Sequence, residues 1–321
     1  MAEQFPILKL EDAALKYVLR CLKMEEILIF SLISKKTFYI IKSLKVKIHS
    51  LNVIIDSIVR VFPFFLRDKD SVFWDFVFAN NAETGEPIQL LVPAKVQVRA
   101  VGRKWLHVWE SMQLNLREWF QHFLALDVQN GIHLEIETDR FDRTSIETTL
   151  EGFKVQEIHL TGSVSVPSVV VDSVSIKECE TGSFANQKIL MQNNVCATFD
   201  QPKVRILDDL LVCSARKISC DTNSIQEKDL NRFLKAWREG SNPGLELLVV
   251  KANVNFGLEG GVMMKGIHFN EIPQRKVRKY DWNARRVCKM RSEKGVIAEI
   301  RVLERNQSRT VEVLIGKDFV Y

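Results

Sequence analysis

The sequence predicts a mixed α+β or α/β fold: a three-helix module at the N-terminal end, then irregularly spaced helices and short strands, then C-terminal β-strands. Three observations support this prediction. Apolar residues recur at helical spacing three times before residue 45. Units of helix, break and alternating strand follow between residues 114 and 250, and alternating segments close the chain. The hydrophobic content of 46% and charged content of 26% are ordinary for a globular protein.

The first three helices are defined by their apolar stripes. The first stripe holds positions i, i+3, i+4 and i+7, namely Leu15, Val18, Leu19 and Leu22. The second helix repeats the spacing with Met24, Ile27 and Leu28. Ser34 is the expected N-cap of the third helix, whose apolar face comprises Thr37, Ile40, Ile41 and Leu44.

This helical module has more apolar residues than its own packing requires. A unit below about 40 residues rarely supplies a stable core by itself. Ile29 and Tyr39 remain unassigned after the stripes are filled. The surplus predicts a covering partner; the alternative is an ordinary helical cap that belongs to the main domain.

The same segment resembles an F-box, and in particular the nematode branch of that family. The matching positions are Pro6, Leu8 and Leu10 in the opening, Leu15, Val18, Leu19 and Leu22 in the first helix, Ile27, Leu28 and Ser31 in the middle, and Ser34-Lys35-Lys36. The resemblance implies that these residues other than Ser31, together with Met24, dock on a Skp-type adaptor of a cullin-RING ubiquitin ligase, with the apolar ones divided between the module's own core and the adaptor groove. Glu11 stands where the family usually has a proline, which would preset the turn into the first helix.

Charge and cysteine content limit the protein class. The net charge of +5 comes from cations and anions mixed along the chain, which argues against nucleic acid as a partner. The six cysteines form no C-x-x-C pair and are expected to be buried thiols in a reducing compartment. The N-terminus lacks a signal-peptide pattern, and the longest apolar run, residues 53–66, is too short and too charged to span a bilayer. We therefore expect a cytoplasmic or nuclear protein without a membrane segment.

After the module, residues 45–49 alternate and predict a strand that leaves the helices without a flexible linker. The module should then be held rigidly on the β-rich region that begins with this strand. The β-favouring residues from Val72 to Phe78, the turn signals after them and the segment 88–92 predict a β-hairpin.

From residue 114, a unit of helix, break and strand recurs. One helix has the stripe Leu116, Trp119, Phe120 and Phe123, and Asn130-Gly131 separates it from a strand at 132–136. A second helix at 144–150 precedes strands at 155–160 and 169–176. In the last unit Ser224 and Glu227 have capping-box spacing, the stripe is Leu230, Phe233, Leu234 and Trp237, and Leu245, Leu247 and Val249 alternate. This repetition favours a degenerate leucine-rich-repeat-like α/β arrangement; the alternative is a generic α+β domain.

A second resemblance lies in the last of these units. Residues 229–237, followed by Gly240-Ser241-Asn242-Pro243, are similar to the signature of the type 2 F-box-associated domain. That resemblance extends over roughly residues 110–260 and implies a role in target recognition, with no catalytic residues. The expected domains are an F-box at 1–45, a β-rich connecting region at 46–110, the F-box-associated domain at 111–260 and a C-terminal β-hairpin region at 261–321.

In the C-terminal region, Val296, Ala298, Ile300 and Val302 should face Val311, Val313 and Ile315, and Cys288 with Met290 predicts a third strand. A basic stretch with aromatic residues precedes these strands. Its candidate target-binding residues are Lys276, Arg278, Lys279, Tyr280, Trp282, Arg285 and Arg286. They suit an acidic or phosphorylated protein target. Single-stranded nucleic acid, a nuclear import signal and a solvated strand face are the alternatives.

The sequence contains no catalytic motif that we recognise, such as G-x-S-x-G, a phosphate loop or H-E-x-x-H. His133 and Glu135 share a strand face but lack further metal ligands nearby in sequence; His107, His122 and His159 are expected at core margins. We therefore expect a non-catalytic substrate-recognition adaptor without cofactor or metal. The alternatives are a nucleic-acid-binding module centred on residues 276–291, and a Skp-bound protein with a structural or sequestering role.

Overall fold

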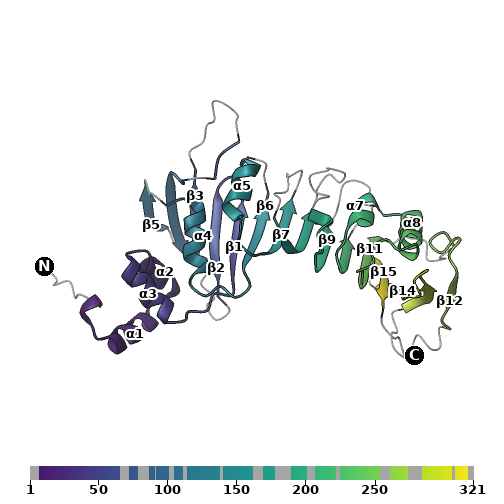
Figure 1. The fold of residues 1–321 in the computed structure, drawn as a ribbon, viewed down its shortest axis with the longest axis horizontal. Helices are drawn as coiled ribbons and strands as arrows, with labels where there is room; N and C mark the ends of the chain where they lie inside the picture. The colour runs from purple at the N-terminus through teal and green to yellow at the C-terminus, as the bar shows by residue number, and fades with distance from the viewer. Residues whose placement is uncertain are drawn as a thin grey trace. The chain divides into compact units, whose positions relative to one another are not determined.

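The computed structural model describes residues 7–65, 72–78, 87–90, 92–100, 105–110, 114–137, 140–161, 169–177, 189–200, 207–221, 225–253, 261–273, 284–305 and 308–316. These residues form an α+β structure with seven α-helices and fifteen β-strands (Figure 1). The chain divides into two compact units. The first comprises Met1–Leu134 with Arg140–Phe153, and the second comprises Glu135–Asp139 with Lys154–Tyr321.

The predicted three-helix module is present in the first unit. A 3-10 turn η1 (Ile7–Lys9) precedes helices α1 (Asp12–Cys21), α2 (Met24–Ser31) and α3 (Lys35–Ser43) (Figure 1). Ser34 is the N-cap of α3, as predicted: its side chain accepts a hydrogen bond from the Thr37 backbone at 3.2 Å. Glu11 precedes α1 with φ of −58°, close to the φ at which a proline ring would be fixed.

The segment that leaves the module differs from the prediction. Residues 45–49 do not form a strand, because Lys45 turns the chain with a positive φ of 52°. Ile48 makes an isolated parallel bridge with Val128, and strand β1 begins only at Ser50. The segment between the helical module and β1 is nevertheless held close to the strands, because the His49 backbone donates a 2.7 Å hydrogen bond to the Phe64 carbonyl.

The first unit contains five antiparallel strands, in which each strand pairs with the next along the chain. They are β1 (Ser50–Ile55), β2 (Val59–Phe64), β3 (Val72–Val77), β4 (Lys95–Ala100) and β5 (Trp105–Glu110). The predicted strand at Val72–Phe78 is confirmed, but its predicted partner at 88–92 is wrong. Strand β4 pairs with β3 instead, and Ile88 makes only an isolated bridge with Phe141.

Aromatic side chains fill the core between these strands and helix α4 (Leu116–Leu124). The predicted stripe is buried, and the ring of Trp119 lies 5.5 Å from Trp74 and 5.4 Å from Phe76. The Asn115 side chain caps α4 by accepting from the Glu118 backbone at 2.9 Å. Helix α5 (Arg143–Leu150) and strand β6 (Ile132–Ile136) also follow the prediction.

The second unit begins with parallel strands that pair in chain order. They are β7 (Val155–Thr161), β8 (Val171–Lys177), β9 (Cys196–Asp200), β10 (Lys217–Asp221) and β11 (Leu247–Asn253). Helix α7 (Leu207–Val212) lies between β9 and β10 in the chain, and α8 (Glu227–Arg238) lies between β10 and β11. The sequence pattern did not indicate β9, α7 or β10.

Two details around α8 correct the prediction. The N-cap of α8 is Gln226, whose backbone N–H donates to the Asp229 carboxylate at 3.1 Å; the predicted capping residue Ser224 lies outside the described residues. In β11 the buried side chains are Leu248 and Val250, not Leu247 and Val249. Pairing with β10 determines which residues of β11 face the interior, because Val250 lies opposite Cys220 and both are buried.

Antiparallel strands complete the second unit, as predicted. They are β12 (Phe269–Glu271), β13 (Ala284–Arg291), β14 (Ile297–Arg305) and β15 (Ser308–Ile315). The predicted partners are in register: Ala298 with Ile315, Ile300 with Val313, and Val302 with Val311. Val296 precedes β14 and is 39% exposed, so it does not share the buried face of that strand. Strand β15 also pairs antiparallel with β11.

Candidate functional site

The structure divides the predicted adaptor-binding residues into buried and exposed sets. Four of them are 4% exposed or less and belong to the interior of the first unit: Leu15, Leu19, Ile27 and Leu28. Leu10, Leu22 and Met24 are half-buried, whereas Leu8 and Val18 are 38% and 37% exposed. The Ser34, Lys35 and Lys36 residues are exposed, and Pro6 lies outside the described residues. The buried set therefore stabilises the module, and only the remainder is available to a partner.

Helix α1 has a second apolar stripe, which points away from the interior. Its members hold positions i, i+3, i+4 and i+7 and are all exposed: Ala14, Tyr17, Val18 and Cys21. Tyr17 is 73% exposed, which is unusual for so large an aromatic side chain. We call these four residues the outer stripe of α1. The resemblance to an F-box points only to Val18 among these four, although their spacing alone predicts the whole stripe.

Further large apolar side chains of the module are also exposed. Ile33, just after α2, is 65% exposed, and Tyr39 on α3 is 66% exposed. Tyr39 was one of the two residues left over after the stripes were assigned. The other, Ile29, is half-buried.

His122 on α4 anchors the module within the first unit. The Ser31 hydroxyl on α2 lies 2.8 Å from His122 Nε2, and the ring of Phe38 on α3 lies 4.9 Å from the imidazole. Burial lowers the pKa of His122 to about 4, so the imidazole is neutral at physiological pH. Two helices of the module therefore contact one side chain of α4. The module is not a mobile appendage of this unit.

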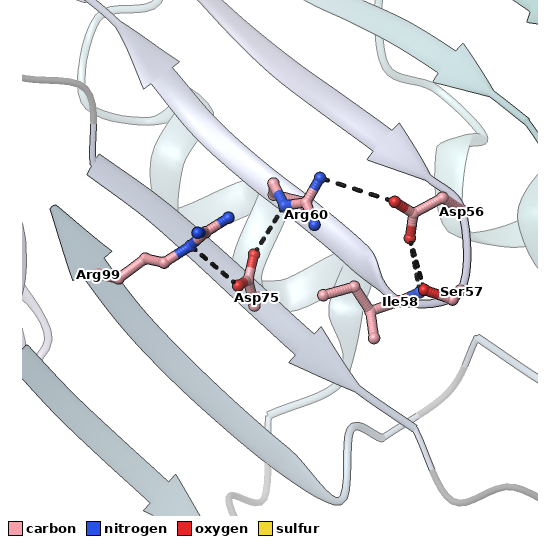
Figure 2. Close-up of polar contacts among 6 residues, drawn as sticks. All are labelled: Asp56, Ser57, Ile58, Arg60, Asp75 and Arg99. Carbon is pink, nitrogen blue, oxygen red and sulfur yellow. Dashed lines mark hydrogen bonds and ion pairs between the residues drawn. The ribbon is translucent and has the colours of Figure 1, made fainter. Parts of the chain in front are cut away.

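The β2–β4 strands carry a buried carboxylate on the face opposite the aromatic core. Asp75 is 2% exposed, and two arginines bind it from the neighbouring strands (Figure 2). The Nε atoms of Arg60 and Arg99 lie 3.0 Å and 3.4 Å from its carboxylate oxygens, and Asp56 lies 3.6 Å from Arg60. A carboxylate desolvated in this way needs both cations, so the cluster ties three strands together.

The structure describes two members of the predicted basic target-binding stretch. Arg285 pairs with Glu304 at 2.8 Å. Arg286 pairs with Glu271 at 3.1 Å and lies over the Phe269 ring at 5.6 Å. Acidic neighbours on β14 and β12 thus partly neutralise both cations. Lys276, Arg278, Lys279, Tyr280 and Trp282 lie outside the described residues.

Several predictions about cysteines and histidines need correction. Cys21 is exposed and Cys196 is half-buried, so not every cysteine is a buried thiol. Burial raises the pKa of Cys213 to about 11 and also raises that of Cys220, which keeps both protonated at neutral pH. His107 is exposed and stacks on Trp109 at 5.7 Å, whereas a position at the core margin was expected.

The part of the chain that the structure describes has neither a cluster of metal-ligating side chains nor a helix that could span a membrane. No group of three or more His, Cys, Asp or Glu side chains among these residues could hold a metal ion. Among the same residues, no helix is both long enough and apolar enough to cross a membrane.

The signature stretch at the end of α8 has a structural role. Its stripe residues Leu230, Phe233, Leu234 and Trp237 are buried. Gly240 has a φ of 110°, which ends the helix, and Asn242 Nδ2 donates to the Leu210 carbonyl on α7 at 3.0 Å. The Glu293 backbone donates to the Arg238 carbonyl at 3.1 Å. The stretch therefore joins α8 to α7 and to the β13–β14 connection.

Comparison with known proteins supports one of the two family resemblances. A family model described as F-box associated matches residues 185–250, which include β9, α7, β10, α8 and the start of β11. The signature stretch lies inside the match. The N-terminal helical module lies outside it. No curated protein and no solved structure matches the chain.

Proposed function

We propose that this protein is the substrate-recognition adaptor of a Skp-cullin-F-box ubiquitin ligase. In this proposal the helices α1–α3 are an F-box of the nematode type, which docks on the Skp-type adaptor. The rest of the chain holds a protein target for ubiquitination. The chain itself performs no chemistry, because the cullin-RING enzymes supply it and the adaptor contributes proximity.

The observation that carries the proposal is the apolar surface left outside the module's core. The outer stripe of α1, together with Leu8, Ile33 and Tyr39, offers large apolar side chains to solvent. Such groups are costly to leave in water and are the usual anchors of a protein interface. The match of residues 185–250 to an F-box-associated family supports a partner of the Skp type for this surface.

The contacts of His122 fit the same role. A ligase adaptor must present its target at a set distance from the ubiquitin donor, so a loosely tethered F-box would lose the benefit of proximity. The Ser31–His122 hydrogen bond and the Phe38–His122 ring contact fix α2 and α3 on the first unit. The short bridge at Ile48 adds a second attachment.

Target recognition is assigned to the second unit. Its parallel strands β7–β11 pair in chain order, but the sequence separation between paired residues differs from one pair of strands to the next. Val155 pairs with Val171, whereas Lys217 pairs with Leu247. We include in the proposal that these strands form the degenerate leucine-rich-repeat-like arrangement that the sequence favours. The F-box-associated match covers three of the five strands, at least in part.

The proposal is tested by co-purification of the full chain with a Skp-type adaptor. Tyr17→Asp and Val18→Asp each place a charge in the outer stripe of α1 without disturbing a buried side chain, so we expect the adaptor to be lost and the fold kept. Val170→Asp is the matched control, because Val170 is 82% exposed in the second unit. Equal recovery of the adaptor with all three variants and the native chain would contradict the proposal.

A further inference from the structure

Helix α3 exposes a group of lysines around one aromatic side chain. The lysines of this helix are all exposed: Lys35, Lys36 and Lys42. Tyr39 lies between them in the sequence and is 66% exposed. At 3.6 residues per turn, these four residues fall within about 120° of the helix circumference. Ile41, on the opposite side, is buried. We call the three lysines and Tyr39 the basic face of α3.

The sequence around this helix is rich in lysine and lacks acidic residues. The segment 27–55 contains five lysines and neither aspartate nor glutamate. Two of the five, Lys45 and Lys47, follow α3 and are also exposed. Among the residues that the structure describes, no carboxylate forms an ion pair with any of the five. Their charges are therefore available to a partner.

The two helices that contact α3 do not change this conclusion. Helix α2 has Glu25 and Glu26 in its first turn, and the Glu26 carboxylate accepts a hydrogen bond from the Lys23 backbone at 2.9 Å. Neither carboxylate lies within ion-pair distance of the basic face of α3. Helix α4 meets α3 where His122 contacts Phe38, and this imidazole is neutral at physiological pH.

The exposed aromatic ring indicates which kind of anionic partner fits this face. Tyr39 is a large, half-polar side chain of the type that anchors protein interfaces, and charged residues commonly form the rim around such an anchor. Ile33, just before the N-cap of α3, adds a second exposed apolar side chain. A nucleic-acid strand would instead require cations that follow its backbone along a groove. The arrangement therefore favours a protein surface with carboxylates.

We propose that the surface of the Skp-type adaptor that covers Tyr39 carries carboxylates, which the three lysines of the basic face of α3 attract during docking. The inference rests on the proposed function for the identity of the partner. It adds an electrostatic requirement to the apolar contacts already described. Exposed charges at the edge of an interface act mainly on the association rate, because they steer the encounter before the surfaces touch.

Stopped-flow measurement of association between the full-length chain and the purified Skp-type adaptor tests this inference. Raising the salt concentration from about 50 mM to about 300 mM should lower the association rate constant of the native chain by roughly tenfold. The combined variant Lys35→Gln, Lys36→Gln and Lys42→Gln should show a similar loss at low salt and little further dependence on salt. Its dissociation rate constant should stay close to the native value.

The matched control replaces three exposed lysines of the second unit by glutamine, namely Lys177, Lys217 and Lys228. This control removes the same charge from the chain and should keep the native association rate. Arginine at all three positions of the basic face of α3 should also keep it, because the charge is retained. If the combined glutamine variant fails to fold, the three single variants take its place, and each should show a smaller loss in the same direction.

Four results would overturn the inference. The first is an association rate of the native chain that does not depend on salt, and the second is an equal loss in the glutamine variant and the control. The third is displacement of the adaptor by a single-stranded oligothymidylate that binds the native chain and not the glutamine variant. Each of these leaves the proposed function intact. The fourth, absence of adaptor binding by the native chain at both salt concentrations, contradicts the proposed function as well.

Discussion

Ser31 and His122 are 91 residues apart in sequence, and their side chains form a 2.8 Å hydrogen bond between α2 and α4. The Ser31 hydroxyl gives its one proton to the Leu28 carbonyl, 2.6 Å away. His122 Nε2 must therefore be the donor to the Ser31 oxygen, which requires the neutral Nε2–H tautomer or the imidazolium. Burial favours the neutral form.

This relationship predicts an acid-sensitive attachment of the helical module. The pKa of His122 is about 4 in the folded chain and 6.5 when unperturbed, so the unfolded state takes up the proton first as pH falls. The contribution of the neutral His122 side chain to the free energy of unfolding is therefore complete above pH 6.5, and it is lost progressively as the pH falls toward 4. Urea unfolding followed by tryptophan fluorescence should show a falling midpoint across this range. In His122→Gln, which keeps a donor but does not titrate, the fall should be smaller; equal slopes in both chains would refute the assignment.

Neighbouring residues of α1 should respond differently to truncation. Leu19 is fully buried, and Leu19→Ala should reduce the free energy of unfolding by about 2–5 kcal/mol, because it removes apolar contacts and leaves a cavity. Val18 is 37% exposed, and Val18→Ala should cost less than about 1 kcal/mol. Urea titration of both variants measures the difference. Similar losses would mean that the outer stripe of α1 is not on the surface.

The sequence predicted six of the seven helices that the structure describes, all except α7, and the clearest of them have local apolar stripes. Leu116, Trp119, Phe120 and Phe123 identify α4 without knowledge of its partner, and the same holds for α8. The partner of β3 could not be predicted in this way. Strand β4 pairs with it across a connection that carries the apolar segment 88–92, and local composition does not reveal which segment will pair with β3.

Two features were not predicted from the sequence. One is which residues of β11 face the interior, and the other is the outer stripe of α1. Leu247, Leu248, Val249 and Val250 are all apolar, so only pairing with β10 decides which of them face inward. On α1 the leucine stripe accounts for one face of the helix and does not explain Tyr17 or Cys21. A helix with two apolar stripes is a local signal, and it indicates that both faces will be covered.

The Asp75 cluster should contribute to the stability of the first unit (Figure 2). Asp75→Asn preserves shape but removes the charge that Arg60 and Arg99 share, and we expect a loss of about 2 kcal/mol in the free energy of unfolding. This loss is at the low end for a buried pair because the Arg99 side chain is 39% exposed. Asp56→Asn is the control and should cost less than about 1 kcal/mol. If Asp75→Asn leaves the free energy of unfolding unchanged, water solvates both arginines as well as the carboxylate does, and the cluster does not stabilise the unit.

The turn after α8 allows a test that depends on backbone conformation alone. Gly240 has a positive φ of 110°, and a methyl group there would meet only the end of the Lys294 side chain at 3.7 Å. Gly240→Ala should therefore destabilise by about 1–2 kcal/mol through strain and not through a clash. Gly244→Ala, where no atom lies within 4 Å and φ is not positive, should be close to neutral. Thermal unfolding of the two variants compares them directly, and equal melting temperatures would contradict the assigned turn.

The central claim is that the outward face of α1–α3 is covered by a Skp-type adaptor. Hydrogen–deuterium exchange of the full chain, with and without the purified adaptor, locates any covered region. We predict slower exchange in Asp12–Cys21 and in the residues around Ile33 and Tyr39, with unchanged exchange in Leu247–Asn253. Unaltered exchange throughout the helical module, at an adaptor concentration that saturates an established F-box protein, would contradict the claim.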